Sequence, residues 1–305
     1  MTKLVFATRA SALARWQTQW VIAALQKAHP GLLCEEKVIS TRGDEILDVP
    51  LTEIDGKGLF TLELENELLS GVVHCAVHSL KDLPVENSEG LTIGCIPSRA
   101  EVRDTLISAQ GFTHVTLSAG ARVGTCSLRR TAQVLAVRPD LKIDPLRGNV
   151  DSRVRKVLAG QYDAIVLAGA GLIRLGLEEY VAEWLSLDVM LPAPGQGALA
   201  VQCRADDQTT LGLLAALEDS TTRKEVTAER EFLLQLGGGC ALPVAAYAQT
   251  GKLGISLRGV VASPDGRKII RVDGYGDDPL ELGDQLARKA VALGAAQILS
   301  MGGSV

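Results

Sequence analysis

The chain has 305 residues, more than a single hydrophobic core usually organises, so we expect two or three domains. It is 47% hydrophobic and 22% charged, and no apolar run reaches the roughly 18 residues of a membrane-spanning helix. A net charge of −5 disfavours nucleic acid and anionic membranes as partners, so a bound anion would need a local cluster of cations. The N-terminus lacks the pattern of a signal peptide, which favours the cytoplasm.

The first hundred residues alternate between short apolar runs and amphipathic segments. Strands are predicted at residues 4–7, 34–40, 72–77 and 91–96. A helix capped by Ser11 is predicted after the first strand, with one face formed by Leu13, Trp16, Trp20 and Ala24.

Between the second and third strands, residues 42–58 carry charge, Pro and Gly without periodicity, which predicts a mobile loop. A helix over residues 60–70, ending at Gly71, is predicted to follow it.

The alternation restarts after a polar connection near residues 99–104. Strands are predicted at residues 104–108, 122–125, 141–146 and 163–168, with helices after Ser127 and Asn149. The segment LPAPGQGALAVQCR (191–204) has the composition of a return crossing followed by a strand. Two crossings predict two α/β lobes that exchange chain.

The pattern changes after about residue 220. A helix at 222–236 leads into Gly237-Gly238-Gly239-Cys240, strands follow at 253–261 and 267–274, and a final helix covers 279–300. Strands flanked by helices predict a small α+β domain.

Six arginines lie just beyond predicted strand ends or on the first turns of the next helices. They are Arg9, Arg129, Arg130, Arg147, Arg153 and Arg174. Open α/β sheets bind ligands at the carboxyl ends of their strands, where helix N-termini add N–H donors. Each arginine alone is more simply a surface charge, but together they predict a ligand with several carboxylates or phosphates. The hydroxyls of Ser11, Thr125 and Ser127 would add donors, and no glycine-rich phosphate motif is present.

Asp82 follows a buried strand in the segment HSLKDLP (78–84) and lies beside Lys81. A carboxylate among cations can stabilise a developing positive charge and move protons. From this segment alone, a turn role before Pro84 is at least as good an explanation. His78 is more simply a packing or hydrogen-bonded histidine.

The cysteines show neither a CxxC pair nor zinc-like Cys/His spacing. Buried, reduced thiols are therefore expected for Cys34, Cys75, Cys95, Cys126 and Cys203. Cys240 follows three glycines at a helix end, which can present its side chain on a loop. It is either a covalent anchor or a further buried cysteine, and its local context alone favours the second.

Segments along almost the whole chain, in order, resemble the porphobilinogen deaminase family. They are ATRASALARWQ (7–17), STRGD (40–44), GKGLF (56–60), HSLKDLP (78–84), RDTLIS (103–108), VGTCSLRR (123–130), LRGNVDSRVRKV (146–157), LAGAGLIRLG (167–176), LPAPGQGALAVQCR (191–204), AEREFLLQLGGGC (228–240) and LRGVVASPDG (257–266). Two departures are Cys126, where serine or threonine is common, and Gly238, where glutamate is common.

The resemblance implies a transferase of tetrapyrrole (haem, porphyrin) biosynthesis. It would join four porphobilinogen molecules, with loss of ammonia, into hydroxymethylbilane on a covalently bound dipyrromethane primer. Cys240 matches the cysteine that holds this cofactor through a thioether. Asp82 matches the catalytic aspartate, which assists ammonia loss and stabilises positive charge on the pyrrole nitrogen. The family needs no metal.

The resemblance also implies roles for the other matched residues. Cofactor binding is implied for Lys81, Asp82, Ser127, Arg129, Arg130, Arg147, Gly148 and Arg153. Substrate binding and elongation are implied for Arg9, Ser11, Arg147, Arg153 and Arg174. Lys57 and Phe60 lie in and after the family's mobile active-site loop.

The implied fold is α/β: two periplasmic-binding-protein-like α/β lobes plus a small α+β C-terminal domain. Domain 1 would span residues 1–97 and 198–217, domain 2 residues 103–191, and domain 3, with Cys240, residues 220–305. A hinge is expected near residues 98–103 and 192–197. We expect a cytoplasmic monomer that binds the small molecule porphobilinogen, but neither nucleic acid nor membrane.

Two other classes of protein share some of these features. A two-lobed anion receptor explains the arginines, but it explains neither Cys240 nor Asp82 and predicts a secretion signal. A cysteine-nucleophile acyl enzyme needs a histidine base near Cys240. The histidines His29, His74, His78 and His114 are all distant from it in sequence.

Overall fold

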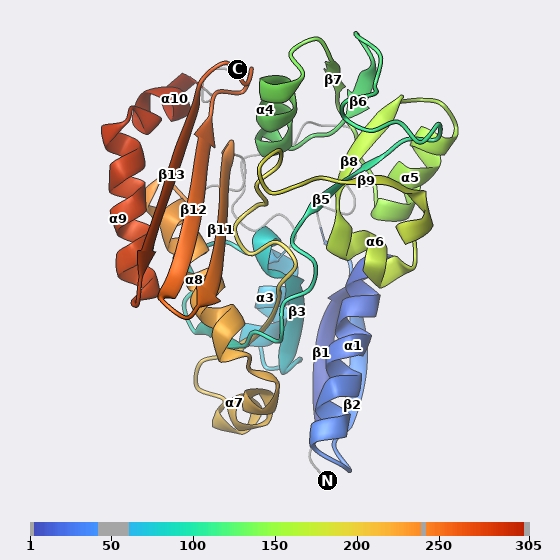
Figure 1. Cartoon of the computed structure of the whole chain (residues 1–305). Coiled ribbons are helices and arrows are strands. Elements are labelled where there is room, and N and C mark those ends of the chain that lie inside the picture. The colour runs from blue at the N-terminus through green and yellow to red at the C-terminus, as the bar shows by residue number, and fades with distance from the viewer. Residues whose placement is uncertain (1–2, 42–60, 239–241, 302–305) are drawn as a thin grey trace. The chain divides into compact units, whose positions relative to one another are not determined.

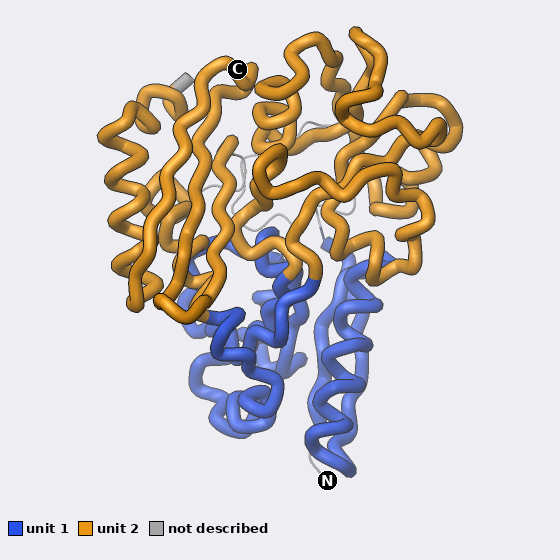
Figure 2. The backbone as a smooth tube through the Cα atoms, viewed as in Figure 1, with its two compact units in different colours: residues 1–100, 198–223 blue, residues 101–197, 224–305 orange. Residues whose placement is uncertain are grey.

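A computed structural model of the chain describes residues 3–41, 61–238 and 242–301. The chain divides into two compact units, residues 1–100 with 198–223 and residues 101–197 with 224–305 (Figure 2). It therefore enters the second unit, returns to the first and leaves it again. The finer division into three domains stays a prediction.

The first unit is built on a five-stranded sheet in the order β2-β1-β3-β10-β4 (Figure 1). Its strands are β1 (Lys3–Arg9), β2 (Leu33–Ile39), β3 (Cys75–Ser79), β4 (Leu91–Cys95) and β10 (Leu199–Arg204). β1 runs parallel to both β2 and β3, and β10 is antiparallel to β3 and β4. The carboxyl ends of the three parallel strands therefore share one edge.

Helix α1 (Ala12–Ala28) follows β1 and begins where predicted, since Ser11 Oγ accepts a hydrogen bond from Ala14 N at 3.3 Å. The predicted tryptophan face is not the buried one: Trp16 and Trp20 are 36% and 40% exposed. The buried residues are Gln17, Thr18, Val21 and Leu25. Burial of the Gln17 amide is tolerated because it donates to Ser79 Oγ at 2.9 Å. The unit also contains α3 (Leu62–Leu69) and α7 (Gln208–Leu214).

The second unit contains a five-stranded sheet in the order β7-β6-β8-β5-β9. Its strands are β5 (Asp104–Ile107), β6 (Arg122–Gly124), β7 (Lys142–Asp144), β8 (Ala164–Ala168) and β9 (Val181–Trp184), and its helices are α4 (Leu128–Val137), α5 (Val150–Leu158) and α6 (Gly169–Leu175). β6 is parallel to β7 and β8, and β5 is antiparallel to β8 and β9. The order repeats that of the first sheet, with β5 in the place of β10. The antiparallel strand next to the parallel three is β10 in the first sheet, the first strand after the chain returns to that unit, and β5 in the second, the first strand after the chain enters it.

The second unit also contains an antiparallel sheet of β11 (Val244–Gly251), β12 (Gly254–Ala262) and β13 (Ile269–Gly276). Helices α8 (Ser220–Gln235) and α9 (Pro279–Ala292) cover it, followed by α10 (Ala295–Met301) (Figure 1). Gly259 and Gly274 let these helices approach, because a Cβ there would meet Phe232 of α8 and Leu286 of α9 respectively. Two α/β sheets and one α+β part confirm the predicted fold class.

Several element predictions were wrong. The final helix is divided at Gly294, whose φ of +101° is unfavourable for other residues. Strand β3 begins at Cys75, so residues 72–74 lie outside it. Strands β9 and β11 and helix α7 were not predicted. In β11 the buried positions are largely alanine, which gives a weak strand signal.

Each α/β sheet has its own apolar core. In the first unit it includes Leu4, Phe6 and Val201, and in the second it includes Ile107, Ile165 and Leu172. Within the described residues, no helix is both long and apolar enough to cross a membrane.

Candidate active site

The carboxyl edge of the first sheet carries Arg9 and Asp82. Arg9 ends β1, and a short 3-10 turn of Leu80–Asp82 follows β3. Because β1 and β3 are parallel neighbours, Ser11 and Lys81 lie at this edge as well. Asp82 is exposed there, and Arg9, Ser11 and Lys81 are half-buried. The sequence prediction that Asp82 follows a buried strand is confirmed.

His78 is buried near the end of β3, and Asp82 lies in the 3-10 turn that follows this strand. Burial lowers the pKa of its imidazole to about 4. A hydrogen bond to Gln202 opposes this shift, the charge of Arg9 adds to it, and the charge of Asp82 opposes it. His78 therefore lies within electrostatic reach of both charged residues at the edge.

The carboxyl edge of the second sheet carries the other predicted residues. Thr125 and Ser127 follow β6, Arg147 and Gly148 follow β7, and Arg174 lies on α6 after β8. These three strands are parallel neighbours, so the residues that follow them share one edge. Ser127 N donates to Thr125 Oγ1 at 3.2 Å, which shapes the turn into α4.

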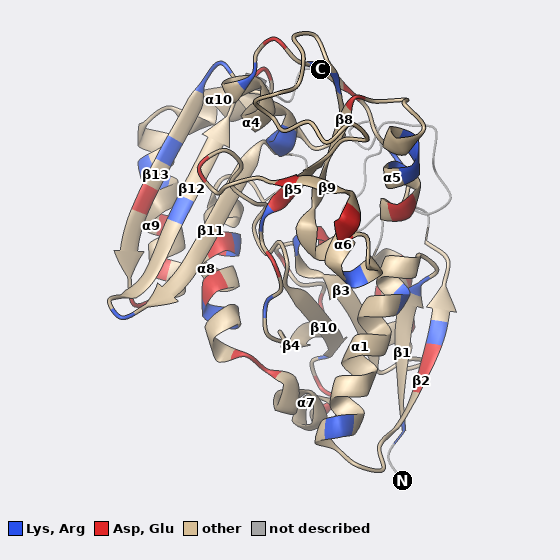
Figure 3. Ribbon diagram, turned by 45° about the vertical axis from the view of Figure 1, so that its right-hand side comes forward, with Lys and Arg blue, Asp and Glu red and all other residues tan. Residues whose placement is uncertain are grey.

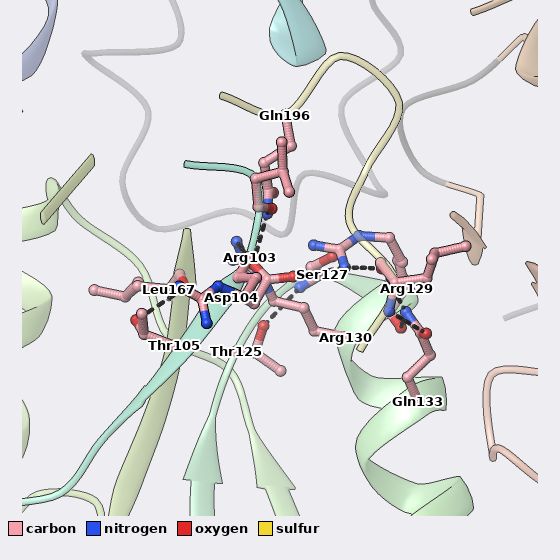
Figure 4. A network of polar contacts seen from close by, with 12 residues as sticks. Arg103, Asp104, Thr105, Thr125, Ser127, Arg129, Arg130, Gln133, Leu167 and Gln196 are labelled. Atoms are coloured by element: carbon pink, nitrogen blue, oxygen red, sulfur yellow. Dashed lines mark hydrogen bonds and ion pairs between the residues drawn. The ribbon is translucent and has the colours of Figure 1, made fainter. Parts of the chain in front are cut away.

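Arg129 and Arg130, on the first turn of α4, are buried against Asp104 at the start of β5 (Figure 4). Arg129 Nη1 donates to Asp104 Oδ2 at 2.8 Å. Arg130 donates to Oδ1 through Nε at 3.0 Å and Nη2 at 2.8 Å. Two guanidiniums against one carboxylate leave a surplus of one positive charge. Burial lowers the pKa of Arg129, against the field of Asp104, but arginine stays protonated near neutral pH.

Two glutamines extend this network to the return crossing. Gln196 Nε2 donates to Val102 O at 2.7 Å and to Asp104 Oδ1 at 3.1 Å. Gln133 donates to Leu191 O at 3.0 Å and accepts from Leu191 N at 2.9 Å. Figure 4 shows Gln133 and Gln196 reaching the group from α4 and from the crossing. The carboxylate of Asp104 thus joins the two crossing segments within the second unit.

Arg174 and Arg153 make backbone contacts. Arg174 is buried and donates from Nη2 to Gly197 O at 2.8 Å, and burial lowers its pKa to about 10. Arg153 Nε donates to Gly148 O at 2.7 Å. The guanidinium of Arg153 therefore holds the turn between β7 and α5.

Arg147 is the strongest indication of an anion-binding site. Its Nη2 is buried, and among the described residues it has no hydrogen-bond partner. An unpaired buried donor is costly, so such an atom favours a bound acceptor. Next to it, Gly148 has a φ of +111°, and a Cβ there would overlap Ser152 Oγ. The turn after β7 therefore fits a carboxylate-bearing ligand.

Cations at these edges do not belong to a basic surface. Figure 3 shows Lys and Arg interspersed with Asp and Glu, with both signs on β2 and on α5. Within the ranges that the structure describes, no group of three or more His, Cys, Asp and Glu side chains could hold a metal ion.

Three predicted site residues, Lys57, Phe60 and Cys240, lie outside the described residues. The prediction of buried thiols was wrong for Cys126, which is exposed in the turn before α4, and for Cys34, which is half-buried. It is confirmed for Cys75, Cys95 and Cys203.

Sequence reasoning missed Asp104, Gln133 and Gln196 as site residues. Asp104 was predicted only as part of the polar connection and as the start of a strand. Its signal is a carboxylate that begins an entirely buried strand, since such a charge requires a partner. Nothing in the local sequence marks the two glutamines.

Two family models match the chain. One, described as porphobilinogen deaminase, dipyromethane cofactor binding domain, matches residues 4–212, and the other, porphobilinogen deaminase, C-terminal domain, matches residues 223–292. The porphobilinogen deaminase of Brevibacillus brevis is 48% identical over 98% of this chain and 97% of its own. That of Roseiflexus castenholzii is 49% identical over 97% of this chain and 98% of its own. Among solved structures, CbnR, a LysR family transcriptional regulator, is similar with a TM-score of 0.44 and 11% identity, over 72% of this chain and 71% of that chain.

Proposed function

The chain belongs to the porphobilinogen deaminase family, and from that premise we propose which of its residues carry out the family's reaction. The reaction joins porphobilinogen units, with loss of ammonia, into hydroxymethylbilane for tetrapyrrole biosynthesis. The dipyrromethane cofactor, when bound, supplies the primer to which the units are added. The observation that best supports the residue assignment is the buried Nη2 of Arg147, which has no hydrogen-bond partner among the residues that the structure describes.

The cofactor would be held by a thioether to Cys240 and by cations around its carboxylates. The proposed cations are Lys81, Arg129, Arg130, Arg147 and Arg153, with Ser127 and Gly148 at the adjoining turns. Guanidinium suits this task because its planar fork donates two parallel hydrogen bonds to a carboxylate. The surplus positive charge around Asp104 supports this assignment, as does the Arg147 donor that lacks a partner within the described part of the chain.

The incoming porphobilinogen would be bound by Arg9, Ser11 and Arg174, with Arg147 and Arg153 serving the growing chain. Each unit brings two carboxylates, so elongation needs more cations than the primer alone. Lys57 and Phe60 would lie in and after the active-site loop.

Asp82 would assist the departure of ammonia and stabilise the positive charge that develops on the pyrrole nitrogen. A carboxylate at a strand end, exposed beside Lys81, can receive a proton and face a substrate cation. Its position at the same sheet edge as Arg9 supports this role.

We also propose the finer assignments that follow from the family. The chain would act as a cytoplasmic monomer without nucleic-acid partners. It would consist of the three domains 1–97 with 198–217, 103–191, and 220–305.

The intact mass of the purified protein tests the chemistry and the anchor together. We expect a surplus equal to two linked pyrroles, which Cys240→Ser loses and the matched control Cys126→Ser keeps, because Cys126 is an exposed thiol to which no anchoring role is assigned. A mass surplus that persists in Cys240→Ser would show that Cys240 is not the anchor. A bare mass in every protein, unchanged after incubation with porphobilinogen, would contradict the proposed chemistry.

A further inference from the structure

A line of buried hydrogen bonds leads from α3 through β10 to His78. Glu65 Oε2 accepts from Ser88 Oγ at 2.8 Å, and Glu65 Oε1 accepts from Gln202 Nε2 at 3.1 Å. Gln202 Oε1 in turn lies 3.2 Å from His78 Nε2. Glu65, Gln202 and His78 are 7%, 1% and 7% exposed, so water does not replace these bonds.

The chemistry of the partners fixes the direction of each bond. A carboxylate only accepts, so the amide nitrogen of Gln202 faces Glu65 and its oxygen faces His78. His78 Nε2 must therefore carry the proton that it donates to this oxygen. The Glu65 carboxylate thus selects the Nε2–H tautomer of His78 by orienting the amide of Gln202 between them.

The strands place this imidazole next to the carboxyl edge of the first sheet, where Arg9 and Asp82 lie. His78 pairs with Ala200 across β3 and β10, so Gln202 is its diagonal neighbour on the same face. Two charged groups act on His78 directly, Arg9 from β1 and Asp82 from the turn after β3. From the side of α1, the neighbouring Ser79 receives the uncharged amide of Gln17.

We propose that Glu65, Gln202 and His78 form a positioning relay that holds the imidazole proton on Nε2, within reach of Arg9 and Asp82, while burial keeps the ring uncharged. An uncharged imidazole adds no charge to this edge, where Arg9, Lys81 and Asp82 lie. This inference rests on the substrate-binding and catalytic roles proposed for those two residues.

The identity of the residue between Glu65 and His78 is the decisive feature. An amide oxygen accepts the Nε2 proton without bringing a negative charge to the ring. A carboxylate at the same place would favour the imidazolium, which would add a positive charge beside Asp82 and oppose the stabilisation of a substrate cation.

The double substitution Glu65→Gln with Gln202→Glu tests the relay. It keeps the side-chain sizes, the number of carboxylates and the net charge, and only moves the negative charge next to His78. We expect the 15N NMR titration midpoint of His78 to rise by about 1–3 pH units. We further expect kcat/KM for porphobilinogen to fall about tenfold on the acid side of the new midpoint, a limb that the parent profile lacks.

An unchanged His78 midpoint in the double variant would overturn the relay. If the His78 midpoint rises but kcat/KM keeps the pH profile of the parent protein, the relay has no role in the reaction. If the double variant does not fold, the parent protein still decides, since an imidazolium or an Nδ1–H tautomer at pH 6 would contradict the proposal. Asp82→Asn separates this test from the proposed function, because normal turnover in that variant would contradict the site and leave the NMR result standing.

Discussion

Arg130 donates twice to a single oxygen of Asp104, through Nε at 3.0 Å and Nη2 at 2.8 Å, while Arg129 binds the other oxygen at 2.8 Å. All three side chains are buried. The shared counter-ion therefore fixes the rotamers of the two arginines before any ligand binds. Such preorganisation reduces the entropy lost when a carboxylate binds.

Asp104→Asn should destabilise the protein by about 3–5 kcal/mol, because it leaves two buried guanidiniums without a negative partner. Urea unfolding monitored by circular dichroism measures this loss. The matched control is Asp151→Asn, which removes the exposed i,i+4 partner of Arg155 on α5 and should leave the midpoint unchanged. Equal midpoints for the two variants would show that Asp104 is not the counter-ion of the network.

Asp82→Asn should preserve the fold and the cofactor mass, since Asp82 is exposed and the substitution keeps its side-chain size. Turnover should fall by roughly 10²- to 10⁴-fold, the usual contribution of a positioned acid or base. Steady-state kinetics with porphobilinogen give the result. Asp206→Asn, whose side chain is 87% exposed in the same unit, is the control and should retain parent kinetics. Near-normal turnover in Asp82→Asn would remove it from the reaction.

The strands and the edges that they form were largely predictable from the sequence. Buried parallel strands are short apolar runs, and the cations that follow them gather wherever those strands are neighbours, as with Arg147 after β7. The strand β10 was found because the segment 191–204 combines turn residues with an apolar run.

What escaped prediction depends on contacts between residues distant in sequence. Gln196 and Asp104 are separated by 92 positions, and Gln202 and Glu65 by 137, so no local pattern relates them. The buried face of α1 was misjudged for a similar reason, because it includes Gln17, whose amide donates to Ser79, 62 positions away. Hydrophobicity alone assigned that face to Trp16 and Trp20.

Arg147→Met should separate ligand binding from stability. The substitution removes a buried donor that has no partner in the described chain, so the cofactor-free protein should be as stable as the parent or more stable by about 1 kcal/mol. Incorporation of the cofactor should be impaired, which the intact mass of the protein measures. Arg155→Met on the same segment is the control, with a side chain that is 71% exposed. Full incorporation and parent kinetics in Arg147→Met would make Arg147 an ordinary surface residue.

The thiols should differ sharply in reactivity. Burial raises the pKa of Cys95 to about 12 and of Cys203 to about 11, and it raises the pKa of Cys75 well above its usual value. Iodoacetamide at pH 8 should therefore label the exposed Cys126 in the native protein and these three only in urea, as peptide mass mapping would reveal. Native labelling of Cys75 or Cys203 at the rate of Cys126 would contradict the buried sheet core.

His78 should make the fold sensitive to acid. Its pKa is lowered by burial from 6.5 to about 4, so above pH 6.5 it is neutral in both the folded and unfolded states. Between these values the unfolded chain binds a proton that the folded chain does not, so stability falls as the pH drops, by up to about 3 kcal/mol. Unfolding free energies at pH 7.0 and pH 4.5 should differ less in His78→Gln than in the parent protein. An equal difference in both proteins would mean that His78 accepts a proton in the folded state, and the uncharged imidazole inferred beneath Arg9 and Asp82 would be wrong.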